Sequence, residues 1–207
     1  MTPKKTHFQK TYQLEWNAFR IDGNMNALSV IYEANFDLLL NYGHKFCRED
    51  SVIEDAIQNI FTNLIRSRGK LTEISNVKQY LMIAQRNELF ELISKSRTTV
   101  STENFSDIIF TPEYSVEEKI VAHEGQTRIK NFLKVSLQKL TSHQQEALYL
   151  KYDMDLSYED ISKILNISVE SCRTAIYRAI KSIRADVESL RERNIHILFS
   201  ILRTVFK

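Results

Sequence analysis

The sequence predicts an all-α protein in which two helical domains are joined by a flexible acidic linker. Only four glycines and two prolines occur among 207 residues, and 43% of the residues are hydrophobic. Both Gly and Pro interrupt helices, so their scarcity favours a mostly helical chain. Residues 96–115 are different: they are rich in Ser, Thr and acids, contain Pro112 and show no sustained period. That composition is typical of a linker between two domains.

Four helices are expected before the linker: 14–20, 25–47, one that begins after Ser51, and one from about Val77 to Lys95. Apolar residues recur in them at intervals of three and four, as one helix face requires. The first helix ends at Asp22-Gly23, which is a helix-stop signal. Ser51 and Glu54 have the spacing of a capping box, in which each side chain satisfies a backbone donor of the first turn.

After the linker, helices are expected from about Val116 to about Tyr152, over 157–165, over 168–184, and in a closing tail. The pair 157–165 and 168–184 has the pattern of a helix-turn-helix, in which Asn166 supplies a left-handed turn. The apolar side of its second helix is expected to face inward: Val169, Cys172, Ile176, Ala179 and Ile183. Cys172 is therefore expected to be a small buried apolar residue rather than a ligand or a reactive thiol.

The other side of the 168–184 helix is polar and basic, which suits a helix that enters the DNA major groove. Arginine can donate two hydrogen bonds to a guanine edge, Ser and Thr can contact bases or phosphates, and Lys neutralises backbone charge. The alternative is an ordinary helical hairpin with a solvated basic face. The DNA-binding candidates are Ser168, Ser171, Arg173, Thr174, Tyr177, Arg178 and Lys181.

Charge is arranged in blocks although the net charge is only +2. Residues 61–97 hold seven Lys or Arg against three Glu, residues 98–126 hold six acids against one Lys, and residues 171–184 hold four Lys or Arg and no acid. Such blocks indicate nucleic-acid-facing segments joined by an acidic one, although solvated surface is the alternative for each.

Cys47 and Cys172 match no disulfide or metal framework, which fits a reducing compartment. The N-terminus lacks the apolar core of a signal peptide. The apolar cluster 195–206 is too short and too interrupted to span a bilayer. We therefore expect a cytoplasmic protein that does not span a membrane.

A metal-dependent nuclease is one rival interpretation, because Glu49, Asp50, Glu54 and Asp55 lie close in sequence. Two-metal chemistry needs carboxylates that converge on one point. These four instead lie at a helix start, where acids interact favourably with the helix dipole. The five histidines are scattered and lack ligand spacing. We expect no enzyme, no catalytic residue, no metal and no cofactor.

Several segments resemble the sigma factors of bacterial RNA polymerase. "LTSHQQEALYLKYDMDLSYEDISKILNISVESCRTAIYRAIKSIR" (140–184) resembles their C-terminal, promoter-binding domain, although Ala175 stands where many members have Arg. "EDAIQNIFTNLI" (54–65) resembles the signature of their core domain, with Asn59 in place of an acid and Ile65 in place of Trp. "VKQYLMIAQRNELFELISKSR" (77–97) is similar to the segment that opens and reads the minus-ten element. Two domains without a third between them is the layout of the extracytoplasmic-function (ECF) group.

The resemblance implies a transcription initiation factor that directs core RNA polymerase to specific promoters and helps to open the minus-ten element. Its implied partners are core RNA polymerase, promoter DNA and an anti-sigma factor, with no small-molecule substrate. The implied divisions are a core domain, an acidic linker, a helix-turn-helix domain that binds the minus-thirty-five element, and a tail helix: 1–97, 98–126, 127–184 and 185–207.

The resemblance also implies the residues of two further surfaces. Those that bind polymerase are Asp55, Gln58, Asn59 and Phe61. Those that bind the minus-ten strand are Lys70, Asn76, Lys78, Tyr80, Arg86, Asn87, Lys95 and Arg97. Promoter opening needs aromatic and basic groups that hold unpaired bases, and the loop 69–76 would supply a pocket for a flipped base. Whether Tyr80 serves this purpose or is simply core stays open.

Three further alternatives stay open at this point. A stand-alone helix-turn-helix regulator would explain 157–184 but would leave 54–65 without a purpose. The acidic linker would run through the RNA path of the polymerase, as the resemblance implies, or would be a solvated tether. The tail would pack back onto the 130–184 domain or would bind a regulator.

Overall fold

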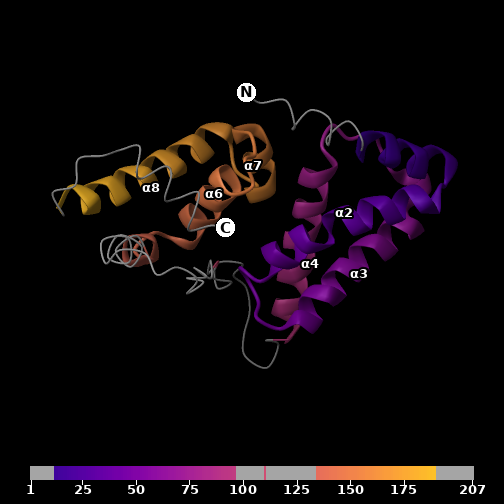
Figure 1. Ribbon diagram of the computed structural model, residues 1–207, viewed down its shortest axis with the longest axis horizontal. Helices are drawn as coiled ribbons and strands as arrows, with labels where there is room; N and C mark the ends of the chain where they lie inside the picture. The colour runs from indigo at the N-terminus through magenta and orange to yellow at the C-terminus, as the bar shows by residue number, and fades with distance from the viewer. Residues whose placement is uncertain (1–11, 97–109, 111–133, 190–207) are drawn as a thin grey trace, which may run out of the picture. The chain divides into compact units, whose positions relative to one another are not determined.

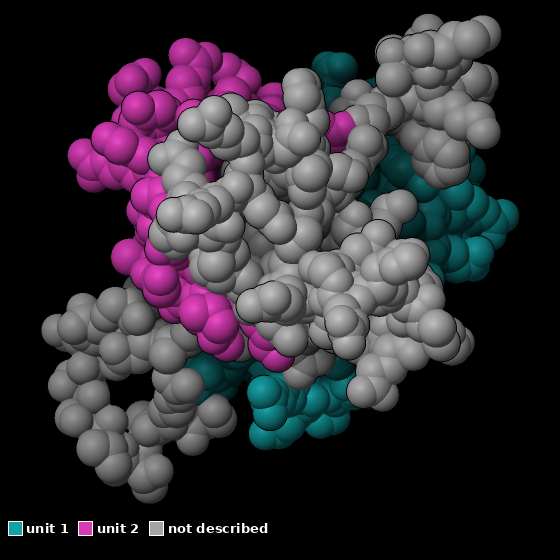
Figure 2. Space-filling model, turned by 60° about the vertical axis from the view of Figure 1, so that its left-hand side comes forward, with its two compact units in different colours: residues 1–108 teal, residues 109–207 magenta. Residues whose placement is uncertain are grey.

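The computed structural model describes residues 12–96, 110 and 134–189 of the chain (Figure 1). The chain divides into two compact units, residues 1–108 and 109–207, which Figure 2 colours separately. All regular secondary structure in the described ranges is helical, so the all-α prediction is confirmed. In these same ranges no helix is long and apolar enough to cross a membrane.

The first unit begins with helical residues 12–17, which run into the π-helical turn η1 (Ala18–Asp22). Gly23 ends this turn with a φ of 72°, and its backbone N–H donates to the Phe19 carbonyl at 3.0 Å. A Cβ at this position would lie 2.8 Å from Nη1 of Arg68, the end of a flexible side chain that can move, so the positive φ is what favours glycine here. The predicted stop signal is therefore confirmed.

Three long helices form the body of this unit: α2 (Met25–Gly43), α3 (Asp50–Arg66) and α4 (Val77–Ser96), with the 3-10 turn η2 (Arg68–Lys70) before α4. Each long helix packs against the other two (Figure 1). The fully buried Ile31, Leu39, Ile53 and Leu81 contribute to their common core. Buried residues recur at intervals of three and four along α3, at Ile53, Ile57, Ile60 and Leu64, which explains why this helix face was predictable.

The predicted capping box at Ser51 is wrong, and α2 ends earlier than predicted. Glu49 is the N-cap of α3 without a side-chain cap bond, so Ser51 already lies inside the first turn. The chain turns sharply after Gly43, where a Cβ would lie only 2.3 Å from Cγ2 of Ile53. The backbone N–H of Glu49 then donates to Sγ of Cys47 at 3.4 Å. After this turn α3 begins two residues earlier than it would with Ser51 as the N-cap.

The second unit contains helical residues 134–138, then α6 (Ser142–Tyr152), α7 (Tyr158–Leu165) and α8 (Val169–Ser189). A capping box joins Thr141 and Gln144 at the start of α6. Asn166 separates α7 from α8 with φ 53° and ψ 49°, the left-handed conformation that the sequence predicts. The helix-turn-helix is therefore present at the predicted position.

The core of the second unit lies between α8 and the two helices before it. Cys172, Ile176, Ala179 and Ile183 are buried as predicted, whereas Val169 is partly exposed. They share the unit with buried residues of α6 and α7: Ala147, Leu148, Tyr149, Leu150, Ile161, Ile164 and Leu165.

Phe110 falls in the range predicted for the linker, yet it is packed into the second unit. Its side chain is 1% exposed, its ring centroid lies 5.6 Å from that of Tyr149, and its backbone N–H donates to Oγ of Ser142 at 2.6 Å. At this residue the chain is held against α6 rather than tethered loosely. The remainder of the predicted linker and the tail from residue 190 lie outside the described residues.

Candidate nucleic-acid interface

The outward face of α8 carries the predicted DNA-binding side chains. Thr174 is partly buried at its edge, and the exposed members are Ser171, Arg173, Tyr177, Arg178 and Lys181. Tyr177 is 66% exposed, which is unusual for a large ring without a packing role. An exposed aromatic ring among cations suits contact with bases or sugars.

Ser168 has a structural task at the start of α8. Its Oγ accepts the backbone N–H of Ser171 at 3.0 Å and lies 2.8 Å from the Ser171 hydroxyl. This is an N-cap bond, which satisfies one of the donors left open at a helix start. The cap therefore fixes the N-terminal turn of α8, the part of a recognition helix that meets base edges.

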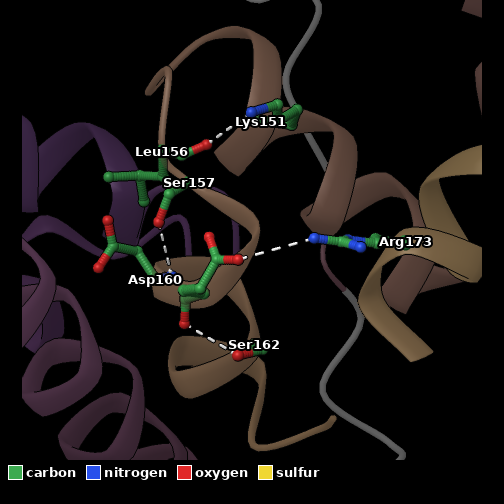
Figure 3. A network of polar contacts seen from close by, with 7 residues as sticks. Lys151, Leu156, Ser157, Asp160, Ser162 and Arg173 are labelled. Atoms are coloured by element: carbon green, nitrogen blue, oxygen red, sulfur yellow. Dashed lines mark hydrogen bonds and ion pairs between the residues drawn. The ribbon is translucent and has the colours of Figure 1, made fainter. Parts of the chain in front are cut away.

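Arg173 is linked to α7 by two contacts, of which Figure 3 shows the ion pair. Its Nη2 lies 3.8 Å from Oε1 of Glu159, and the centre of its guanidinium lies 5.5 Å from the centroid of the Tyr158 ring. On the same ring, Nζ of Lys151 lies 4.6 Å from the centroid and also donates to the Leu156 carbonyl at 3.0 Å. The start of α7 thus brings together an acid, an aromatic ring and two cations.

The thiol of Cys172 is fully buried beneath this face. Burial raises the pKa of the Cys172 thiol, and the opposing effect of the Lys151 ammonium is smaller. A raised pKa keeps the thiol protonated near neutral pH, so it is a poor nucleophile and a poor metal ligand. The prediction of a small buried apolar residue is confirmed.

In the first unit, the loop before α4 is held by the N-terminal helical turn. Nε1 of Trp16 donates to the Thr72 carbonyl at 3.2 Å, and Nε2 of Gln13 donates to the Ile74 carbonyl. Asn76 is buried, and its Oδ1 accepts the backbone N–H of Gln79 at 3.0 Å. Asn76 therefore caps α4, a task that its predicted role in DNA binding did not include.

Tyr80 is partly buried against the core of the first unit. Its ring centroid lies 5.1 Å from that of Trp16, with an interplanar angle of 56°. Burial raises the pKa of the Tyr80 phenol, so its hydroxyl stays protonated at physiological pH. The Tyr80 ring thus packs against the core and is also partly accessible. Its position is compatible both with a core role and with stacking on unpaired bases.

The other predicted minus-ten residues are spread along α4 and the segment before it. Arg86 places its guanidinium centre 4.3 Å from the Phe90 ring centroid. Lys95 pairs with Glu91 one turn earlier, and its hydrogen bond to Glu91 raises the pKa of the Lys95 ammonium. Lys70 and Asn87 are exposed, and Lys78 is partly exposed. Arg97 lies outside the described residues.

Sequence reasoning missed Trp16 and Gln13 as supports of this surface. Both lie more than fifty positions before the loop they hold, so helical spacing carries no signal of the contact. The one available hint was that Trp16 is the only tryptophan in the chain.

The predicted polymerase-binding residues lie on α3 but differ in exposure. Asp55 and Gln58 are exposed, while Nδ2 of Asn59 donates to Oε1 of Glu88 at 2.8 Å and so links α3 to α4. Phe61 is 7% exposed, and its ring centroid lies 5.0 Å from that of Tyr32. Beside them is an open groove of about 480 Å³ lined by Tyr32, Phe36, Glu54, Gln58, Phe61, Thr62 and Ile65.

The acids at the start of α3 have no metal-binding arrangement. Nε2 of His44 lies 3.4 Å from Oδ1 of Asp50. Over residues 12–96, 110 and 134–189, no three side chains of His, Cys, Asp or Glu converge as metal ligands would.

Residues 133–183 match the family described as sigma-70, region 4. The chain is 29% identical over 159 residues to the ECF RNA polymerase sigma factor SigM of Bacillus subtilis (strain 168), which covers 77% of this chain and 94% of that protein. Among solved structures, CnrH in complex with the cytosolic domain of CnrY has a TM-score of 0.56 at 14% identity and covers 86% of this chain and 98% of that one. RpoE in complex with the anti-sigma factor NepR from Bartonella quintana has a TM-score of 0.49 at 19% identity and covers 81% of this chain and 97% of that one.

The region 4 match falls on the helix-turn-helix with the exposed basic face, and the match to SigM extends the likeness over both units. Residues 133–183 are thus similar to sigma-70 region 4, and most of the chain is similar to an ECF sigma factor of bacterial RNA polymerase.

Proposed function

We propose that this protein is a non-catalytic initiation factor that binds core RNA polymerase, directs it to a set of promoters and helps to open the minus-ten element. The observation that carries the proposal is the coincidence of two findings on one segment. Residues 133–183 match sigma-70 region 4, and in that segment α8 presents an exposed basic face from a rigidly capped helix start.

Two DNA surfaces divide the work in this proposal. The α8 face would read the minus-thirty-five duplex, since a recognition helix places its N-terminal side chains at base edges in the major groove. The loop before α4 and the outer side of α4 would hold the minus-ten strand by stacking and by phosphate contacts. The proposed divisions of the chain are 1–97 for the core domain, 98–126 for the linker, 127–184 for the helix-turn-helix domain and 185–207 for the tail.

The polymerase would contact α3 through Asp55, Gln58, Asn59 and Phe61, beside the groove described above. The open groove, with Tyr32 at 37% and Ile65 at 47% exposure, gives this face an apolar patch with polar neighbours. Such a composition is typical of protein-binding surfaces. This function places the chain in the cytoplasm, where it would also meet an anti-sigma partner; CnrH was solved with the cytosolic domain of another protein.

Asp55→Arg tests the polymerase contact more cleanly than a change at Phe61, because Asp55 is exposed and Phe61 belongs to the core. Reversing a charge within an interface places an unfavourable cation there. We expect the dissociation constant for core RNA polymerase to rise by about tenfold or more. The measurement is a binding titration of labelled core polymerase with the full-length chain.

Asp22→Arg is the matched control, since it makes the same charge change at an exposed position of η1 rather than α3. It is expected to bind polymerase as the unaltered chain does. Equal binding by Asp55→Arg and Asp22→Arg would remove α3 from the interface. Specific duplex binding by the chain alone, with no affinity for core polymerase, would favour a stand-alone helix-turn-helix regulator.

A further inference from the structure

The ion pair between Glu159 and Arg173 lies at the surface, beside the face that α8 presents to DNA. The Glu159 side chain is 61% exposed and the Arg173 side chain 54% exposed. An exposed pair of this kind contributes little to the stability of a fold. Glu159 also lies in the first turn of α7, where an acid interacts favourably with the helix dipole, but Asp160 shares that turn and that effect. Glu159 in addition contacts Arg173, so its effect on the arginine is the role that can be tested against Asp160.

The carboxylate of Glu159 is carried on a well-fixed support. Oγ of Ser157 accepts the backbone N–H of Asp160 at 3.0 Å, and Oγ of Ser162 donates to the Glu159 carbonyl at 2.9 Å (Figure 3). Lys151 holds the Leu156 carbonyl just before the cap. These bonds set the first turn of α7, so Glu159 meets Arg173 from a defined position.

Two physical effects follow for Arg173. A long side chain loses considerable rotamer entropy when it is ordered, and a partner that restricts it beforehand reduces that loss on binding. The guanidinium has five N–H donors, so a contact at Nη2 leaves donors with which it can engage a base edge. The negative carboxylate also repels phosphate, which makes a backbone contact at the same place less favourable.

We propose that Glu159 is a positioning residue that sets the base specificity of Arg173, directing the guanidinium to a base edge and away from the phosphate backbone. The Tyr158 ring supports the same orientation by lying beside the guanidinium. This inference rests on the proposed function, since it requires α8 to read promoter DNA.

The test is Glu159→Gln in the full chain, assembled with core polymerase and used to transcribe a library of randomised minus-thirty-five elements. The position that Arg173 reads is defined as the one whose preference disappears in Arg173→Ala. At that position Glu159→Gln is expected to reduce the preference for the best base by about two- to fivefold, the range that an exposed ion pair supports. In the Arg173→Ala background, Glu159→Gln is expected to add no further change.

Asp160→Asn is the matched control. It removes the same charge from the same first turn of α7, and its carboxylate points away from Arg173 in Figure 3. It is expected to leave the preference unchanged, and all variants are expected to share one thermal unfolding midpoint.

Equal base preferences of Glu159→Gln and Asp160→Asn at the position that Arg173 reads would overturn the inference. An effect of Glu159→Gln that persists without Arg173 would also overturn it, because the glutamate would then act by general charge or structure. If the unaltered chain with core polymerase selected no upstream element, the proposed function itself would fail, and this inference would fail with it.

Discussion

Replacing Trp16 by alanine is expected to lower the free energy of unfolding by about 3–5 kcal/mol, the usual cost of removing a large buried ring. Trp16 is 0% exposed and belongs to the core of the first unit. The substitution removes its contacts with Tyr80 and the donor to the Thr72 carbonyl. The loop before α4 then keeps the hydrogen bond from Gln13 but loses the one from Trp16. Opening of the minus-ten element should therefore weaken as well.

Urea unfolding of the full chain, followed by far-ultraviolet circular dichroism, measures this change. Fluorescence is unsuitable, because Trp16 is the only tryptophan. Leu14→Ala is the matched control: Leu14 is nearby in the same helical stretch and 68% exposed, so its loss is expected to cost less than about 0.5 kcal/mol. Equal midpoints for the two variants would contradict the position assigned to Trp16.

Replacing Arg173 by alanine is expected to abolish selection at one upstream position while leaving polymerase binding intact. A good bidentate contact between arginine and guanine contributes about 1–3 kcal/mol of discrimination, which corresponds to about fivefold to 150-fold. Arg173 is exposed and lies outside the core, so the fold should tolerate its loss. Transcription from a library with a randomised minus-thirty-five element measures the effect.

Lys163→Ala is the control for Arg173→Ala, since it removes one exposed positive charge from α7 rather than from the outward face of α8. It is expected to retain the full upstream preference. A preserved preference in Arg173→Ala would remove Arg173 from base recognition. A loss of polymerase binding in the same variant would show that α8 faces the enzyme instead of the DNA.

Helix faces were predictable from the sequence because they depend on local spacing. The buried positions of α8 follow from intervals of three and four, and only Val169 is more exposed than predicted. Asn166 was predictable for a similar reason, because few residues tolerate the left-handed conformation.

Contacts between distant segments were not predictable in this way. Trp16 and Thr72 are 56 positions apart, and Phe110 reaches α6 from within a polar, acidic stretch. The capping box at Ser51 failed because the turn after Gly43 delivers the chain into α3 earlier than the local motif indicates. Local motifs compete with the packing of neighbouring helices, and here the packing prevailed.

The candidate surfaces were predicted largely by resemblance, and the structure adds what each side chain does within the fold. Asn76 caps a helix, and Asn59 links two helices. Such residues combine a structural contact with a predicted binding role, so their substitution alone does not separate the two. Arg173 and Asp55 are exposed and provide the cleaner tests.

The most direct test of the central claim is promoter-dependent transcription by bacterial core RNA polymerase with and without the full-length chain, on a library of random promoters. The account predicts stable co-purification with core polymerase and start sites that share an upstream and a minus-ten element, found only when the chain is present. Failure to associate with core polymerase, or start sites that do not change on adding the chain, would contradict it.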